Sequence, residues 1–243
     1  RWDLGLCQPA LELRSRGRRL RLRALDADGE RLLTLFGPAL QAEPTVATVT
    51  VDAMSVVAEL SPMAAVFAEE ERSRQPSVFT ALRALLKALR GAGGADGYLG
   101  FYGAFGYDLV FQFEPIAQRH ARSAEGVDDC VLYLPLAVLV VDRRRETAHW
   151  HRYCVQTPAG PAGPPPLGSS AQGDARAAAP ASGTAEVRSD QSVADFLRKV
   201  EQVKAGCARG DFFEVVLSQE FQVPCALPGS QIFDRLSARN PSP

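Results

Sequence analysis

Hydrophobic and polar residues alternate over several short stretches of the chain, and each stretch predicts a β-strand. In residues 20–25 leucines alternate with arginines, as on a strand with one buried and one exposed face. Residues 26–29 read as a turn, and the β-branched residues 45–51 predict a second strand. Residues 134–142 and 147–155 predict a hairpin with a charged turn between them.

Two segments show helical spacing with recognisable ends. One has Pro76 in its first turn, Gly91 at its end, and an apolar face made by Val78, Leu82, Leu85, Leu86 and Leu89. The other starts at a capping pair, Ser192 and Asp195, and ends near residues 206–210. Its apolar stripe consists of Val193, Phe196, Leu197, Val200, Val203 and Cys207.

The C-terminal part predicts one more strand and one more helix. Residues 212–223 contain the continuous apolar run 215–217, which is typical of a strand covered on both faces. Ile232, Phe233 and Leu236 indicate a short final helix. Together these elements predict an α+β fold with a mixed or antiparallel sheet.

Residues 157–188 differ from the rest because Pro, Ala, Gly and Ser dominate and large apolar residues are almost absent. Such a segment cannot bury enough surface to offset its ordering entropy, so it predicts a disordered linker. The predicted organisation is therefore an N-terminal domain at 1–156, the linker at 157–188, and the start of a second domain at 189–243.

Composition narrows the class of protein. The net charge of -1 argues against a general nucleic-acid binder, and the basic run 14–23 fits the exposed face of a strand. Five scattered cysteines without a CxxC pair fit reduced thiols in a cytoplasmic compartment better than a disulfide framework. No apolar run approaches the roughly 20 residues that span a bilayer, so no membrane association is expected.

Three groups of residues could carry chemistry. Residues 97–108 are rich in glycine and aromatic residues, but they lack both the Walker pattern and the dinucleotide fingerprint. This favours a strand whose glycines let aromatic rings or another backbone approach closely. His149 and His151 share a strand face, yet a pair is too few for a metal site. Glu214 lies on the predicted buried strand, where a carboxylate needs a partner, a metal or a raised pKa, so it is the best single functional candidate, with a structural hydrogen-bond role as an equal alternative.

The residues then show a family resemblance. Residues 69–79, 102–109 and 111–116, the segment 209–219 and the final turn 240–243 together resemble anthranilate synthase component I. The similarity is greatest to the fused form that continues into a glutamine amidotransferase. It covers residues 20–243 apart from the linker. The resemblance implies a two-lobed α+β sandwich of large, mainly antiparallel sheets with helices outside.

The resemblance also implies an activity. The family converts chorismate and ammonia to anthranilate and pyruvate with Mg²⁺, as a step in tryptophan synthesis, and the ammonia comes from glutamine through the amidotransferase. The ligands of Mg²⁺, the catalytic His and the substrate Arg are expected after residue 243, so no metal ligand is assigned here. Glu214 stands where unfused relatives carry Gln and water-using relatives carry Lys, which implies a pocket residue that favours ammonia.

The two ends of the chain add further expectations. A start at Arg1 and an end on a proline turn predict the N-terminal part of a longer protein. In the family that turn, here Asn240, Pro241, Ser242 and Pro243, borders a site for inhibitory L-tryptophan. The full-length protein is expected to be an oligomer in the cytoplasm, or alternatively in the plastid stroma.

Other functions remain open at this point. Within the same superfamily the alternatives are aminodeoxychorismate synthase and the aminating enzymes of phenazine synthesis. From another class, the chain could be a non-catalytic regulatory module that has kept the fold.

Overall fold

The structure is a computed structural model of the 243-residue chain. It describes residues 2–63, 68, 70–71, 75–92, 97–114, 127–163 and 186–240. The chain forms two units, Arg1–Ser169 and Ser170–Pro243.

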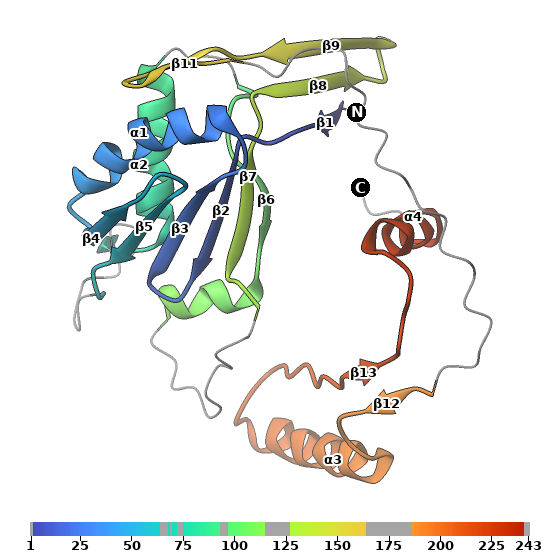
Figure 1. Cartoon of the computed structure of the whole chain (residues 1–243). Helices are drawn as coiled ribbons and strands as arrows, with labels where there is room; N and C mark the ends of the chain where they lie inside the picture. The colour runs from blue at the N-terminus through green and yellow to red at the C-terminus, as the bar shows by residue number, and fades with distance from the viewer. Residues whose placement is uncertain are drawn as a thin grey trace. The chain divides into compact units, whose positions relative to one another are not determined.

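A six-stranded sheet is the centre of the first unit, with the strand order β4-β5-β3-β2-β7-β6 (Figure 1). Every neighbouring pair in it is antiparallel. The strands are β2 (Leu11–Arg16), β3 (Arg19–Ala24), β4 (Val46–Val51), β5 (Ser55–Leu60), β6 (Tyr102–Phe105) and β7 (Cys130–Leu134). The alternating burial of β3 confirms the predicted half-buried strand, since its leucines are buried and its arginines are exposed.

Helix α1 (Ala27–Gln41) covers the apolar face of this sheet and was missed by the sequence analysis. The prediction of a turn at residues 26–29 is wrong because these residues start the helix. Asp26 is its N-cap, and its carboxylate accepts a hydrogen bond from the backbone N–H of Gly29 at 2.8 Å. Asp and Gly are therefore cap and first-turn residues here, with Phe36 and Leu40 buried further along.

Helix α2 (Val78–Gly91) lies behind the sheet in Figure 1 and matches the predicted helix. Ser77 is its N-cap and forms a capping box with Thr80. A 3₁₀ helix (Tyr107–Gln112) braces this start, because the buried side chain of Gln112 accepts from the N–H of Val78 at 2.9 Å and donates to the carbonyl of Gly17 at 2.7 Å. The N-terminal end of α2 is thus tied to the β2–β3 turn.

A smaller antiparallel sheet has the order β1-β8-β9 and contains the predicted hairpin. Its strands are β1 (Trp2–Leu6), β8 (Ala137–Asp142) and β9 (Thr147–Arg152). Asp142 shapes the charged turn by accepting from the backbone N–H groups of Arg144 and Arg145 at 3.0 and 3.1 Å. An ion pair between Asp3 and Arg143 joins the edge strand to that turn.

A short hairpin, β10 (Val155–Thr157) and β11 (Gly160–Ala162), completes the first unit. Val155 and Ala162 are buried in the same core as the helices. The predicted linker therefore starts too early, because residues 157–163 are held by strand pairing and apolar contacts. Residues 164–185, the greater part of the predicted linker, lie outside the described residues.

In its described residues, 186–240, the second unit has two helices and one minimal ladder. Helices α3 (Val193–Arg209) and α4 (Gly229–Arg239) confirm the predicted helices, with Ser192 as the N-cap of α3. Strands β12 (Arg188–Ser189) and β13 (Phe221–Gln222) pair over two residues each. The apolar stripe of α3 stays largely exposed, as does that of α4.

The antiparallel sheets with their covering helices confirm the α+β fold. All five cysteines lie in the described part of the chain, and each is a free thiol. In that same part, no helix has the length and apolar character needed to cross a membrane.

Candidate functional site

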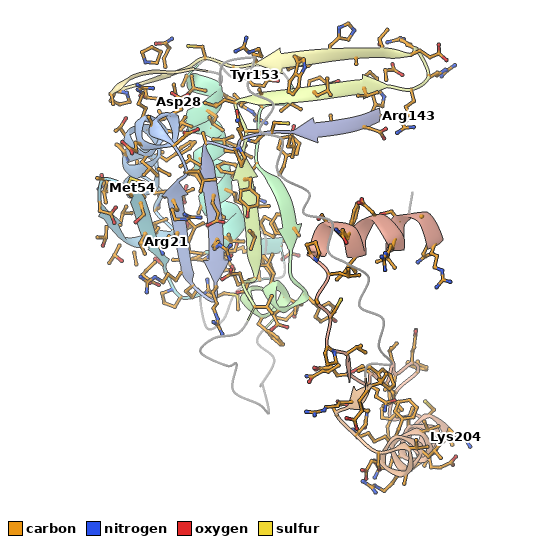
Figure 2. The ribbon with its side chains drawn as sticks, turned by 45° about the vertical axis from the view of Figure 1, so that its right-hand side comes forward. Arg21, Asp28, Met54, Arg143, Tyr153 and Lys204 are labelled. Carbon is orange, nitrogen blue, oxygen red and sulfur yellow. The ribbon has the colours of Figure 1, made fainter. Side chains whose placement is uncertain are left out.

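The face of the six-stranded sheet that points away from α1 and α2 carries a cluster of charged side chains. Glu12, Arg14, Arg21 and Arg23 line a shallow hollow of about 250 Å³ on this face. Strand register brings them together, since Glu12 pairs with Arg23 and Arg14 pairs with Arg21 across β2 and β3. Figure 2 labels Arg21 on the ribbon of β3.

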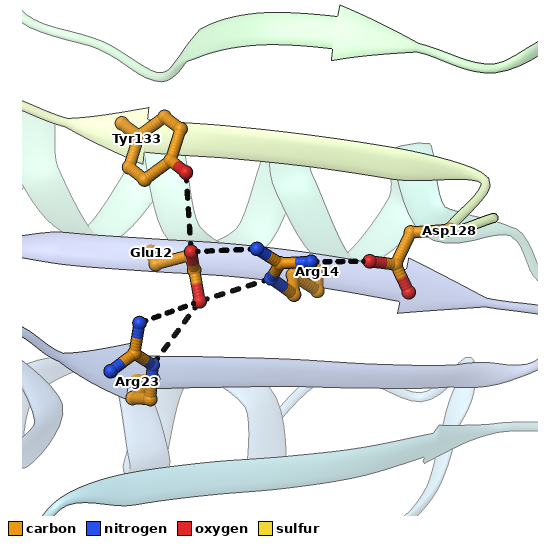
Figure 3. A network of polar contacts seen from close by, with 5 residues as sticks. All are labelled: Glu12, Arg14, Arg23, Asp128 and Tyr133. Atoms are coloured by element: carbon orange, nitrogen blue, oxygen red, sulfur yellow. Dashed lines mark hydrogen bonds and ion pairs between the residues drawn. The ribbon is translucent and has the colours of Figure 1, made fainter. Parts of the chain in front are cut away.

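Glu12 is the centre of this cluster, as Figure 3 shows. Its side chain is only 7% exposed. Arg23 donates through Nε and Nη2 to Glu12 Oε1, each at 3.1 Å, and Arg14 Nη2 donates to Oε2 at 3.1 Å. Tyr133 Oη donates to Oε2 at 3.2 Å, and Arg14 Nη1 also reaches Asp128 Oδ2 at 2.7 Å. One carboxylate thereby joins strands β2, β3 and β7.

These contacts fix the ionisation of the cluster. The hydrogen bond from Arg14 lowers the pKa of Glu12, burial opposes this, and Arg23 lowers the pKa further. Glu12 is therefore ionised at neutral pH and already satisfied by donors. The ionised carboxylate of Glu12 holds neighbouring strands together, and it cannot act as a general acid at neutral pH.

The glycine- and aromatic-rich segment 97–108 lies beside α2 and supplies strand β6. A Cβ atom on Gly103 would stand 2.1 Å from the carbonyl oxygen of Val131, so only glycine allows β6 to approach β7 this closely. This confirms the interpretation of the segment as a strand that another backbone approaches. Tyr102 donates its hydroxyl hydrogen to the carbonyl of Tyr98. An apolar pocket of about 400 Å³ separates this segment from α2.

The histidines and cysteines that the structure describes do not gather into a metal site. His149 is exposed on β9, and the ring of His151 lies 4.5 Å from that of Tyr98. Across the described ranges, no group of three or more His, Cys, Asp or Glu side chains could hold a metal ion. Burial raises the pKa of the Cys130 thiol to about 11, so this thiol stays protonated at neutral pH.

Glu214, the main predicted site residue, lies in the second unit between α3 and β13 and is exposed. The predicted strand over 212–223 is wrong except at β13, and Val216 is 85% exposed. An apolar run becomes a buried strand only where neighbouring strands pair with it. The described part of this unit supplies only the two-residue partner β12.

The predicted tryptophan-binding turn is described at one residue. Asn240 caps the C-terminal end of α4, where its N–H donates to the carbonyl of Leu236 at 2.8 Å. Pro241, Ser242 and Pro243 lie outside the described residues. Among the described residues, the structure therefore brings neither Glu214 nor Asn240 together with another predicted site residue.

The sequence analysis missed the charged cluster around Glu12 and the apolar pocket beside α2. The sequence does contain a signal for the charged cluster. Glu12 and Arg14 alternate with Leu11 and Leu13, so the two charged side chains share one face of a strand. The pairing of Glu12 with Arg23 could not be read without the strand register. The pocket depends on the packing of α2 against residues 97–105, which no local pattern specifies.

Comparison with known proteins shows what the chain is similar to. The family model described as chorismate binding enzyme matches residues 43–243. An anthranilate synthase of Azospirillum brasilense is 42% identical over 243 residues, which is 100% of this chain and 32% of that protein. Anthranilate synthase component 1 of Vibrio cholerae is 29% identical over 249 residues, which is 99% of this chain and 46% of that protein.

A solved structure agrees at the level of the fold. The crystal structure of anthranilate synthase component I from Streptococcus pneumoniae has a TM-score of 0.50 and 17% sequence identity, and the similarity covers 100% of this chain and 46% of that one. The chain thus spans between about a third and about half of the length of these relatives.

Proposed function

The chain belongs to the chorismate-binding enzyme family, and on this premise we propose that it is part of an anthranilate synthase. The single observation that carries the proposal is 42% identity along the whole chain to a protein of that name. The proposed reaction converts chorismate and ammonia to anthranilate, pyruvate and water. The ring loses its hydroxyl at C4, gains nitrogen at C2, and becomes aromatic when pyruvate leaves.

The proposed source of ammonia is a glutamine amidotransferase. The same chain covers 32% of the Azospirillum protein but 46% of the Vibrio component 1, so the Azospirillum protein is the longer of the two. This difference supports a fused amidotransferase in the protein that carries this chain.

Mg²⁺ is the proposed cofactor, but the described residues do not fit a site for it. No group of three potential ligand side chains converges among them. We therefore assign no step of the reaction to a metal held by these residues. What the described part of the chain contributes is the scaffold: a rigid antiparallel sheet whose polar face is tied by Glu12.

A direct assay tests the proposed function. The protein extended to the full length of its relatives is expected to form anthranilate, detected by its fluorescence, from chorismate with glutamine or ammonia. The 243-residue chain alone is expected to form none, because it spans at most 46% of the component 1 relatives compared above. Accumulation of aminodeoxychorismate would instead favour the runner-up function, and no amination at all would refute the proposal.

We infer that the turn at Asn240–Pro243 forms part of a site for L-tryptophan as feedback inhibitor. Two prolines restrict the backbone, while Asn240 and Ser242 offer hydrogen-bonding groups to an amino acid. In the full-length protein, Ser242→Ala is expected to raise the inhibitory tryptophan concentration about tenfold, since one hydrogen bond to a charged group is lost. Inhibition curves that overlay those of the wild type would show that the turn has no such role.

The same resemblance supports three further proposals. Residues 189–243 would begin the catalytic domain, Glu214 would line its substrate pocket, and the full-length protein would be a cytoplasmic oligomer. Because Glu214 is exposed here, its role requires that further strands of the longer protein cover it. A structure of the full-length protein with Glu214 in solvent would refute this role, and sedimentation would test the oligomer.

A further inference from the structure

The apolar pocket beside α2 has the size and lining of a small-molecule site. Its volume of about 400 Å³ falls within the range of roughly 300–1,000 Å³ that is usual for ligand pockets. Helix α2 forms one wall, and the segment 97–105 forms the other. The lining residues are Phe79, Leu82, Arg83, Leu86, Gly97, Leu99, Gly100, Phe101, Tyr102, Phe105 and Leu132.

Four of the eleven lining residues are aromatic. The rings of Phe79 and Phe105 make a tilted contact with centroids 5.4 Å apart, and the ring of Phe101 lies 6.1 Å from the buried ring of Phe36. Aromatic walls of this kind favour a planar ring, which stacks on them in offset or edge-on geometry. Two glycines, Gly97 and Gly100, contribute no side chain to the described lining, and a Cβ on Gly100 would meet only a Leu86 methyl at 4.0 Å.

Arg83 is the charged group of the pocket. It lies one helical turn after Phe79 and therefore on the same side of α2. Within the described part of the chain, Arg83 takes part in no hydrogen bond or ion pair. Its neighbour Lys87, one turn further along, lines a different hollow, between α1 and α2. Among the described residues, the pocket thus combines apolar walls with one guanidinium that has no ion-pair partner, and such a group complements an anion.

We propose that this pocket binds an aromatic monocarboxylate. The ring lies against Phe79, Phe101 and Phe105, and the carboxylate accepts hydrogen bonds from Arg83, whose planar fork matches a carboxylate in bidentate geometry. The tyrosine hydroxyl of the lining does not compete for the ligand, because Tyr102 already donates to the carbonyl of Tyr98. The proposal does not depend on the enzymatic activity.

Fluorescence titration of the full chain with 2-naphthoate tests the proposal. A ligand of this size is expected to bind with a Kd on the order of 1 mM or tighter. The neutral isostere 2-naphthamide is expected to bind at least about tenfold more weakly, because it forms no charged hydrogen bond with the guanidinium.

Matched variants locate the site. Arg83→Gln is expected to weaken 2-naphthoate binding about tenfold and to leave 2-naphthamide binding unchanged, whereas Lys87→Gln is expected to change neither. Gly100→Leu is expected to abolish binding of both probes by filling the mouth, with an unchanged thermal melt as proof of folding. Equal affinities of the wild type and Arg83→Gln, equal losses in Lys87→Gln, or no saturable binding to the wild type would each overturn the proposal.

Discussion

Replacing Gly29 with alanine is expected to lower the free energy of unfolding by about 3 kcal/mol, although alanine is the better helix former. A Cβ atom at this position would stand 2.1 Å from the carbonyl oxygen of Ala10 and 3.1 Å from Cα of Ala24. These are backbone atoms, and the Ala10 carbonyl also accepts the N–H of Leu25 at 2.9 Å. The first turn of α1 must therefore move away from β2 and β3.

Urea unfolding followed by circular dichroism measures this loss, and Gly91→Ala is the matched control. Gly91 is also helical, at the end of α2, but no atom lies within 4 Å of a Cβ placed there. The control is expected to be neutral or stabilising by up to about 1 kcal/mol. Equal stability of Gly29→Ala and the wild type would show that α1 does not need this close approach.

Replacing Glu12 with glutamine is expected to cost about 2 kcal/mol at neutral pH. The substitution keeps the shape of the side chain but removes the charge that Arg14 and Arg23 surround. The side chains of both arginines are about half exposed, at 47% and 45%. Water therefore solvates the two guanidinium groups in the variant and offsets part of the lost interaction with Glu12. Glu59→Gln is the control, because the Arg19–Glu59 pair on the same face is exposed and longer, at 3.7 Å. The control is expected to cost less than about 0.5 kcal/mol.

The effect of Glu12→Gln is also expected to depend on pH. The pKa of Glu12 in the folded state lies below its ordinary value of 4.5, so between these two values the unfolded chain binds more protons. The contribution of the charge is therefore fully present above pH 4.5 and is lost as the pH falls through the folded-state pKa. Unfolding curves of wild type and variant should converge in acid. A difference that stays constant there would point to packing as its cause.

Local signals were sufficient for α2 and misleading for α1. Helix α2 has an apolar face, a serine cap and a clear end, and these agree with its tertiary role. Helix α1 contains the sequence Asp26 to Gly29 at its start and Pro38 in its interior, which are residues that commonly mark turns. Its start uses the glycine for close packing, and that reason is visible only when the sheet is present.

Long-range features explain the other differences from the sequence analysis. The hairpin of β8 and β9 was predictable because its two strands and turn are contiguous. The apolar run near Val216 looked like a buried strand, yet its burial depends on neighbours that its own residues do not specify. The Glu12 cluster was missed for the related reason that its partners come from three strands. The fold class followed from the patterns, and the contacts between distant strands did not.

The position of β7 in the sheet has a consequence for the rate at which the protein folds. Strands β2 to β5 and helix α1 are contiguous in sequence, and their widest pairing, between Arg19 and Glu59, closes a much shorter loop than β7 does. Strand β7 then joins β2 across a long separation, with Glu12 and Tyr133 lying 121 positions apart. Closing so large a loop costs entropy before its contacts form, which slows folding. During synthesis, the edge of β2 that pairs with β7 therefore stays unpaired until β7 has left the ribosome.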